Sequence, residues 1–201
     1  AALQRQEHAL GIAPSAARSA HLQALEPRAG QPGTAVVITG QQVGLFLGPL
    51  FTFFKAASVI AVARAMEQES GVRCVPLFWL QTEDHDYAEI DHCYTYRPGS
   101  EPLKSQLVPD DEAASVLQQR TSIAHRCLPR SIVEQLDALQ EALAELPMAA
   151  DFLQLLRAHY RPGASLSGAF ASVLSELFSD EGLLVFEPRQ AQISALAHPL
   201  Y

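Results

Sequence analysis

Two short apolar runs, separated by a glycine-rich loop and a long apolar stretch, constrain the fold more than any other feature. The first run, Ala35–Thr39, ends at Gly40, and the second, Cys74–Leu80, ends shortly before the acidic segment Glu83–Asp86. Continuous apolar runs of this length are typical of strands buried on both faces. Between them, Leu50–Glu69 has the length and apolarity of a buried helix. This order is a βαβ unit, which predicts a parallel sheet with a right-handed crossover.

The second half of the sequence predicts a helical insertion and one more strand. The insertion spans about 131–178, begins at Ser131 in a capping-box pattern with Glu134, and contains three helices near 131–146, 149–160 and 166–178. A further short strand is predicted at 93–97, whereas 98–130 has little periodicity. The closing apolar run, 182–186, predicts a third parallel strand in the same sheet.

The domain organisation follows from these elements. Residues 1–34 are rich in Ala, Gln and Pro and predict an N-terminal arm with weak helical character. Residues 35–201 predict a partial α/β domain that contains the insertion. Because no helix follows the closing strand, the sheet is incomplete as a βαβ repeat, and we expect the chain to be a fragment.

Charge and cysteine content exclude several classes of protein. A formal net charge of −8 with scattered arginines argues against a nucleic-acid-binding protein. The three cysteines form no CxxC pair, which predicts free thiols in a reducing compartment. The longest apolar stretch, 51–65, is interrupted by Lys55 and Arg64 and is shorter than the roughly 20 residues of a membrane span. We therefore expect a cytoplasmic protein.

The loop after the first strand contains candidate ligand-binding residues. Such a loop presents backbone N–H groups and the positive end of a helix dipole, which suit a phosphate or carboxylate. Its spacing matches neither a Walker A loop nor a dinucleotide fingerprint, so a packing role for the glycines is the alternative. Lys55 lies one turn into an apolar helix, where it must reach solvent or bind an anion. The candidates for substrate or nucleotide binding here are Thr39, Gly40, Gln41, Gln42, Gly44, Gly48 and Lys55.

The acidic segment after the second strand contains the candidate catalytic residues Glu83, Asp84, His85 and Asp86. In open α/β sheets, ligands bind outside the carboxyl ends of the strands, where this segment and the glutamine pair should share one pocket. Neighbouring acids would hold the imidazole as a cation or an oriented base. A solvated loop is the alternative.

Three aromatic or imidazole side chains extend this hypothesis. Trp79, at the end of the second strand, and Tyr160, at a polar helix end, are further candidates for substrate binding. Together with Asp84–Asp86, His92 leaves open a metal-assisted hydrolase. Because the possible ligands lack a characteristic spacing, we expect no structural metal.

Four segments, in order and at compatible spacing, closely resemble the BshC family of bacillithiol-biosynthesis proteins. They are Val36–Pro49 (VVITGQQVGLFLGP), Phe51–Lys55, Phe78–Asp86 with its TEDHD sequence, and Tyr160–Gly163. The resemblance covers about 33–190, and the motifs are specific in combination rather than singly.

The resemblance implies a Rossmann-like fold similar to nucleotidyltransferases and class I aminoacyl-tRNA synthetases. It also implies a ligase that joins L-cysteine to glucosaminyl-malate by an amide bond, the last step of bacillithiol synthesis, with ATP and Mg²⁺ as implied cofactors. Family members are homodimers through a long coiled coil that these 201 residues lack. No HIGH-type or KMSKS-type signature is present, so an adenylating mechanism is analogy. We expect an N-terminal fragment that is inactive alone; the alternatives are a metal-assisted hydrolase and a non-catalytic nucleotide- or sugar-binding remnant.

Overall fold

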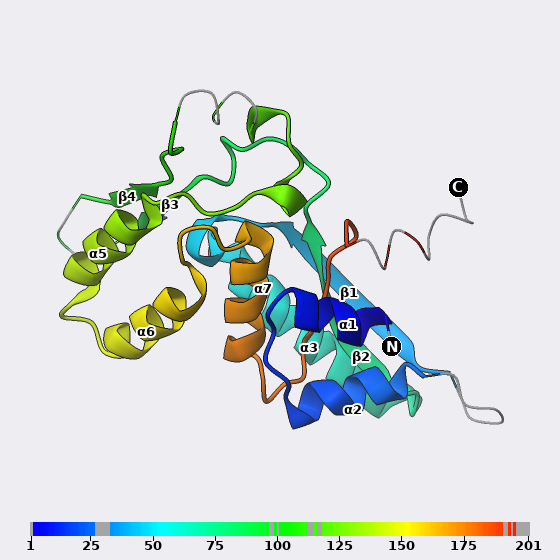
Figure 1. Ribbon diagram of the computed structural model, residues 1–201. Coiled ribbons are helices and arrows are strands. Elements are labelled where there is room, and N and C mark those ends of the chain that lie inside the picture. The colour runs from blue at the N-terminus through cyan, green and yellow to red at the C-terminus, as the bar shows by residue number, and fades with distance from the viewer. Residues whose placement is uncertain are drawn as a thin grey trace.

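A three-stranded parallel sheet lies at the centre of the computed structural model, which describes residues 2–26, 33–96, 99, 101–111, 115, 118–190, 193 and 195 (Figure 1). The strands are β1 (Ala35–Gln42), β2 (Cys74–Gln81) and β5 (Leu184–Phe186), in the order β1–β2–β5. β1 and β2 pair in parallel over their whole length, and β2 pairs in parallel with β5. The predicted parallel sheet is therefore confirmed.

The crossover helix α3 (Phe51–Ser70) connects β1 to β2 and ends at Gly71, whose left-handed backbone (φ 68°) lets its N–H bond to the Glu67 carbonyl. Ala56, Val59 and Ile60 are buried against the sheet. The expectation of a helix buried all round is wrong, because one side of α3 remains exposed. That side carries Phe51, Phe54, Val62 and Met66.

The two faces of the sheet are covered unequally. On one face, Val37, Phe78 and Val185 join the main core with α3 and with α7 (Leu166–Leu177), whose residues are buried from Leu166 to Ser175. On the other face, Val75, Leu77 and Leu184 form a small core with side chains of α2 (Ala16–Ala24). Ile38, on this second face, is 56% exposed. The second face is therefore only partly covered by the described residues.

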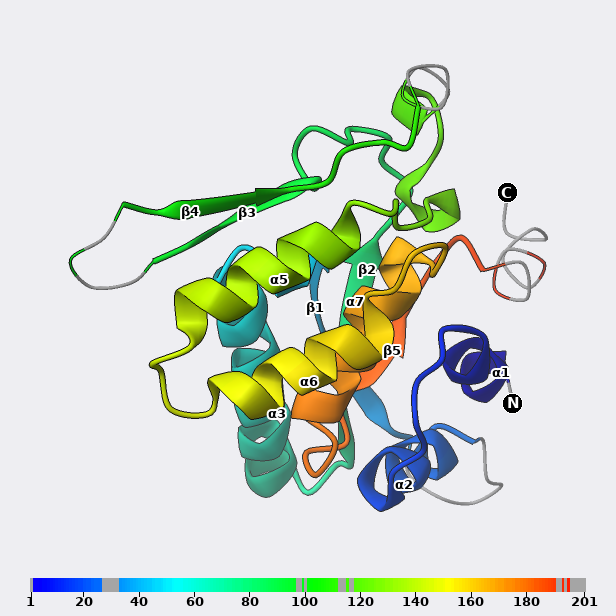
Figure 2. The same cartoon turned by 60° about the vertical axis from the view of Figure 1, so that its left-hand side comes forward.

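The N-terminal arm consists of α1 (Ala2–Ala9) and α2, which pack beside β5 and α7 (Figures 1 and 2). Gln6 Nε2 donates to the Val185 carbonyl at 3.0 Å, and Arg18 Nη1 donates to the Ser175 carbonyl at 2.9 Å. Ser15 caps α2 by accepting from the Arg18 N–H. Long-range hydrogen bonds thus connect the arm to β5 and α7. No helix in the described ranges is long and apolar enough to cross a membrane.

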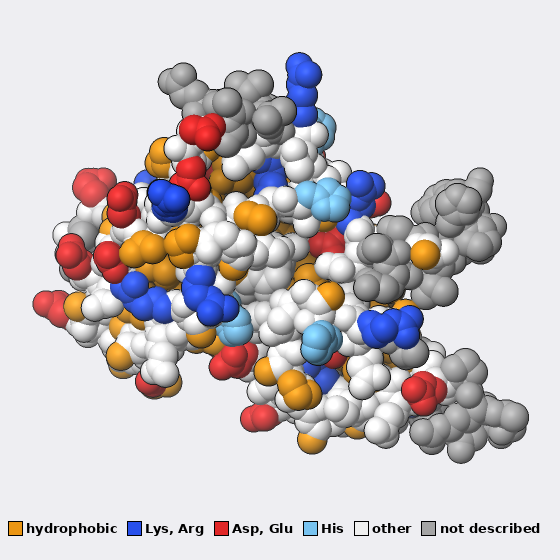
Figure 3. Space-filling view, viewed as in Figure 1, with side chains coloured by type: hydrophobic (Ala, Val, Ile, Leu, Met, Phe, Trp, Pro, Cys, Tyr) orange, Lys and Arg blue, Asp and Glu red, His pale blue; other side chains and the backbone are white. Residues whose placement is uncertain are grey.

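The helical insertion contains α5 (Ile132–Leu143) and α6 (Ala149–His159) before α7, as predicted. The predicted capping box is wrong: Ser131 caps nothing, because its hydroxyl donates to the Val108 carbonyl and accepts from the Val108 N–H, both at 2.9 Å. On the face in Figure 3, hydrophobic side chains gather over α5 and α6, with both acidic and basic groups around them.

A small antiparallel ladder precedes the insertion and projects from the body of the molecule (Figure 2). It pairs β3 (His92–Thr95) with β4 (Leu103–Gln106). The predicted strand at 93–97 is present over 92–95, and residue 97 lies outside the described residues. The partner β4 was not predicted. Two 3₁₀ turns lie at Leu45–Leu47 and Ile123–His125.

Candidate functional site

The two candidate loops meet at the carboxyl edge of the sheet through Gln42, the last residue of β1. Its Nε2 donates to Asp84 Oδ2 at 3.0 Å and to Glu89 Oε2 at 2.7 Å. Because β1 and β2 are parallel and end opposite one another, their following loops emerge at the same edge. The structure therefore brings Gln42 and Asp84 together.

The acidic segment is a turn built around one carboxylate. Asp84 Oδ1 accepts from the backbone N–H groups of His85 (2.6 Å) and Asp86 (3.1 Å). Those two bonds, the one from Asp86 first, hold the pKa of Asp84 below its usual range, and the Gln42 amide adds to the effect. The His85 imidazole is 72% exposed, and Glu83 and Asp86 are also exposed. The turn fixes Asp84 as an anion and presents its neighbours to solvent.

A cavity of about 750 Å³ opens beside this turn. Its polar wall includes Asp84, His85, Asp86 and Asp91, and the segment after β4 supplies the apolar wall Leu107–Pro109. The volume suits a small-molecule ligand. Gln41 and Gln42 are not among the residues that line it; Gln42 reaches the cavity wall only through Asp84.

The glycines at the end of β1 and in the following loop lie in close contact with neighbouring backbone and side chains. A side chain on Gly44 would place its Cβ 2.0 Å from the Gly48 carbonyl oxygen, and one on Gly48 would lie 3.1 Å from the Cβ of Cys93. Gly40 lies under Trp79, whose carbonyl oxygen would be 2.8 Å from an added Cβ. Residues 43–47 are buried. The structure thus gives these glycines a packing role, which is the alternative to ligand binding.

Tyr160 belongs to the same packed region. It is 1% exposed, and its ring meets the Phe46 ring edge-on at a centroid distance of 5.2 Å. Burial raises the pKa of the Tyr160 hydroxyl, against the lowering effect of the Leu47 and Phe46 amides. The Leu47 and Phe46 amides lie near the hydroxyl, but it makes no well-formed hydrogen bond to the described residues. The structure places Tyr160 in the core beneath the loop.

The remaining candidate binding residues divide between the two faces of the sheet. Lys55 Nζ donates to the Gly40 carbonyl (3.0 Å) and to Gln41 Oε1 (2.6 Å), which ties α3 to the end of β1. Thr39 pairs with Phe78 on the main-core face. Trp79 lies on the second face, with its ring 4.5 Å from that of Phe186. Lys55, Gln41 and Thr39 could therefore act together on one ligand, whereas Trp79, on the opposite face, could not join them.

Phosphate would have a limited set of partners at this edge. Lys55 and the Gln41 amide could hold it, provided that Lys55 exchanged one of its present bonds for the ligand. The amides at 52–54 in the first turn of α3 already donate to the Pro49 and Leu50 carbonyls. Over the described ranges, no group of three or more His, Cys, Asp or Glu residues is arranged to hold a metal ion. His92 instead pairs with Asp91 at 2.8 Å. No observation therefore favours the metal-assisted hydrolase.

Sequence reasoning missed two buried groups beside the site. Thr82 donates its hydroxyl to Glu187, which follows β5, and both side chains are fully buried. Burial raises the pKa of Glu187. Arg126 is 3% exposed and lies over the Tyr87 ring. Their sequence signal was weak, because Arg126 falls in the aperiodic 98–130 segment and Glu187 lies beyond the last predicted strand.

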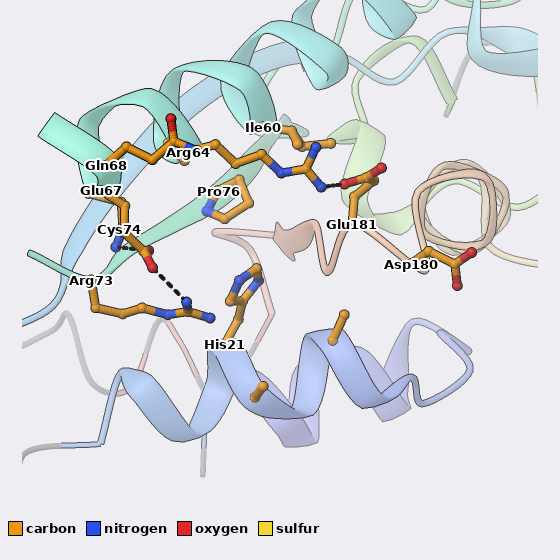
Figure 4. A pocket seen from close by; sticks show the side chains of 13 residues that line it. His21, Ile60, Arg64, Glu67, Gln68, Arg73, Cys74, Pro76, Asp180 and Glu181 are labelled. Atoms are coloured by element: carbon orange, nitrogen blue, oxygen red, sulfur yellow. Dashed lines mark hydrogen bonds and ion pairs between the residues drawn. The ribbon is translucent and has the colours of Figure 1, made fainter. Parts of the chain in front are cut away.

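A second cavity, of about 280 Å³, lies at the opposite, amino edge of the sheet between α2 and α3 (Figure 4). Four of the five Arg, Asp and Glu side chains that line it are paired with one another. Arg64 contacts Glu181, and Arg73 Nη1 lies 2.8 Å from Glu67 Oε1. Glu67 also accepts from the Cys74 N–H. Since these partners satisfy each other, the carboxyl edge is the better candidate site.

Comparison with known proteins gives one family. A family model described as "Bacillithiol biosynthesis BshC, N-terminal Rossmann-like domain" matches residues 1–201. A protein of Salinibacter ruber named "Putative cysteine ligase BshC" is 33% identical over 170 residues, 85% of this chain and 30% of its own length. Proteins of the same name from Solibacter usitatus (31% over 172 residues; 86% and 31%) and Geobacillus thermodenitrificans (32% over 164 residues; 81% and 29%) are also similar. The chain thus spans about 30% of the length of these relatives.

Proposed function

Because the chain belongs to the BshC family of bacillithiol-biosynthesis proteins, as its N-terminal Rossmann-like domain, we propose that it is part of a ligase that adds L-cysteine to glucosaminyl-malate. The observation that carries the proposal is the Gln42–Asp84 contact, which joins both motif loops at the carboxyl edge beside a cavity of small-molecule size. The names of the relatives support a cysteine ligase.

The acidic wall of the cavity suits an amine substrate. Asp84 and Asp91 attract the ammonium group of the acceptor sugar, and the lowered pKa of Asp84 keeps its carboxylate charged. His85, open to the same cavity, takes a proton from that nitrogen so that its lone pair is free. The amine nitrogen then attacks the activated carboxyl carbon of cysteine. The amide C–N bond forms as the bond to the activating group breaks.

Activation of the cysteine carboxylate is the part of the proposal for which ATP, with Mg²⁺, is the implied cofactor. When bound, ATP supplies the group that makes the carboxylate reactive. Lys55 and Gln41 are the residues that would bind its phosphates, as donors fixed in place before the reaction. The four proposed catalytic residues remain Glu83, Asp84, His85 and Asp86.

We further propose that this chain is inactive alone. The rest of the polypeptide would cover the exposed side of α3 and the exposed Val36 and Ile38 beside the outer edge of β1. α3 and these two β1 residues lie on opposite faces of the sheet, and large exposed apolar side chains on each face are the surface that we expect the rest of the polypeptide to cover. We also propose that the complete enzyme is a homodimer and that it is located in the cytoplasm. The three free cysteines of the chain fit a reducing compartment such as the cytoplasm.

The direct test supplies the purified chain with cysteine, ATP and glucosaminyl-malate and measures bacillithiol by mass spectrometry. We expect no product from the 201-residue chain alone and product once the remaining polypeptide is supplied. Turnover by the chain alone would refute the fragment hypothesis. No turnover by the complete enzyme with any activating nucleotide would refute the ligase hypothesis.

A further inference from the structure

The segment 122–126, which has no periodic sequence pattern, is hydrogen-bonded to the backbone of the acidic turn. The Ser122 hydroxyl and the Ala124 N–H both donate to the Thr82 carbonyl, at 2.5 and 3.2 Å. The Ile123 N–H donates to the Asp84 carbonyl at 2.9 Å. The backbone of 82–84 is thus bonded to the 122–124 segment at both ends. The N–H groups of His85 and Asp86 bond to the Asp84 carboxylate, which leaves the His85 carbonyl and the Tyr87 ring for contacts from outside the turn.

One side chain reaches across that remaining part. Arg126 Nη2 donates to the His85 carbonyl at 3.1 Å, and the guanidinium carbon lies 4.4 Å from the centre of the Tyr87 ring. Tyr87 also lines the 750 Å³ cavity. Arg126 therefore contacts the residues on both sides of Asp86, by a hydrogen bond on one side and a cation–π contact on the other.

Burial of the Arg126 side chain is energetically unfavourable. It is 3% exposed, makes no ion pair within the described ranges, and leaves Nε and Nη1 without a hydrogen-bond acceptor there. A buried charge with no partner of opposite sign costs free energy, and apolar replacements of buried ionic groups are often neutral or stabilising. Global stability thus gives no reason for an arginine here, whereas its contacts to His85 and Tyr87 do.

We propose that Arg126, acting through Tyr87, is a positioning residue that fixes the orientation of His85 and Asp86 at the mouth of the cavity. The proposal rests on the proposed catalytic role of the acidic segment. It assigns to the 122–126 segment a function that the sequence motifs do not indicate. The cation–π contact requires only the face of the ring, so the Tyr87 hydroxyl is dispensable for positioning.

The experiment compares Arg126→Met, Tyr87→Leu and the matched control Tyr87→Phe, which keeps the aromatic face. Amide hydrogen exchange followed by mass spectrometry on the 201-residue chain reports peptide 83–91, with a peptide from α7 as the internal reference. For Arg126→Met and Tyr87→Leu we expect exchange in 83–91 to become about 10-fold faster, with the α7 peptide unchanged. The thermal midpoint of Arg126→Met should stay within about 3 °C of the parent chain. Tyr87→Phe should match the parent in both measurements.

Unchanged exchange in 83–91 for both Arg126→Met and Tyr87→Leu would overturn the proposal. Equal acceleration in 83–91 and α7, with a lower midpoint, would also overturn it, because Arg126 would then act on overall stability. If Arg126→Met does not fold, Tyr87→Leu alone decides. In the complete enzyme, the two variants should lower kcat about 10-fold or more and change KM little. The exchange result does not depend on activity, so failure of the ligase assay would refute the proposed function without touching this measurement.

Discussion

The glycine loop 40–49 and the acidic segment 82–91 follow neighbouring parallel strands and share one edge of the sheet, yet they differ in almost every physical property. Residues 43–47 of the first are buried, and its glycines allow backbone contacts that no side chain would permit. The second exposes Glu83, His85 and Asp86 beside a cavity. Two motifs of similar prominence in the sequence therefore serve different ends: one builds the fold, and the other presents ionisable groups. Substitutions in the glycine loop should therefore lower stability most, and substitutions in the acidic segment should lower activity most.

The largest expected effect is that of Gly44→Ala. The new Cβ would lie 2.0 Å from the Gly48 carbonyl oxygen, so the loop cannot keep its path, and we expect the free energy of unfolding to fall by about 5 kcal/mol. Gly33→Ala is the matched control, because no described residue lies within 4 Å of its added Cβ, and it should change stability by less than about 0.5 kcal/mol. Urea denaturation followed by circular dichroism measures both. Similar midpoints for the two variants would contradict a packing role for the loop.

Tyr160 tests whether the residue beneath the glycine loop is structural. Tyr160→Ala removes a fully buried ring and should cost about 3–5 kcal/mol of unfolding free energy. Tyr160→Phe removes only a buried hydroxyl that makes no well-formed hydrogen bond to the described residues, and it should change the free energy of unfolding by less than about 1 kcal/mol. In the complete enzyme, Tyr160→Phe should retain kcat. A large loss of kcat for Tyr160→Phe at unchanged stability would move this residue from the core into the site.

Asp84→Asn should have an intermediate effect, about 1 kcal/mol, because the charge strengthens two backbone hydrogen bonds. The pKa of Asp84 is lower in the folded chain than its ordinary value. Its stabilisation is therefore complete above the unfolded pKa and is lost as the pH falls through the folded pKa. Stability curves of the parent and Asp84→Asn should differ near pH 7 and converge at acidic pH. Glu83→Gln, at an exposed neighbouring position, is the control and should follow the parent at all pH values.

The smallest expected effect on stability and the largest on activity belong to the same substitution, His85→Ala. Its side chain is 72% exposed, so unfolding should change by less than about 0.5 kcal/mol. In the complete enzyme, loss of the proposed base should lower kcat about 100-fold or more. His8→Ala, an exposed histidine on α1, should leave both unchanged. Wild-type activity in His85→Ala would remove this residue from the mechanism.

Much of the fold was predictable because its signals are local. The apolar runs at β1, β2 and β5 and the long stretch of α3 need no distant partner to be recognised, and all four are present. Ser131 shows the limit of such reasoning. Its pattern with Glu134 favours a helix cap, but the Val108 backbone, 23 residues away, offers the hydroxyl both a donor and an acceptor. Tertiary contacts thus overrode a local preference.

The sequence by itself determined the parallel sheet, the edge at which both motif loops emerge, and the family, since each depends on the order and spacing of residues along the chain. Only the tertiary structure decided where each motif residue lies and what it contacts. It buried Gly44 and Tyr160, tied Lys55 to the end of β1, and left His85 open beside a cavity. It also set the unpatterned Arg126 behind the acidic segment. The physical reason is that burial and close approach depend on segments far apart in sequence, and no local pattern records which of two polar loops those segments will cover.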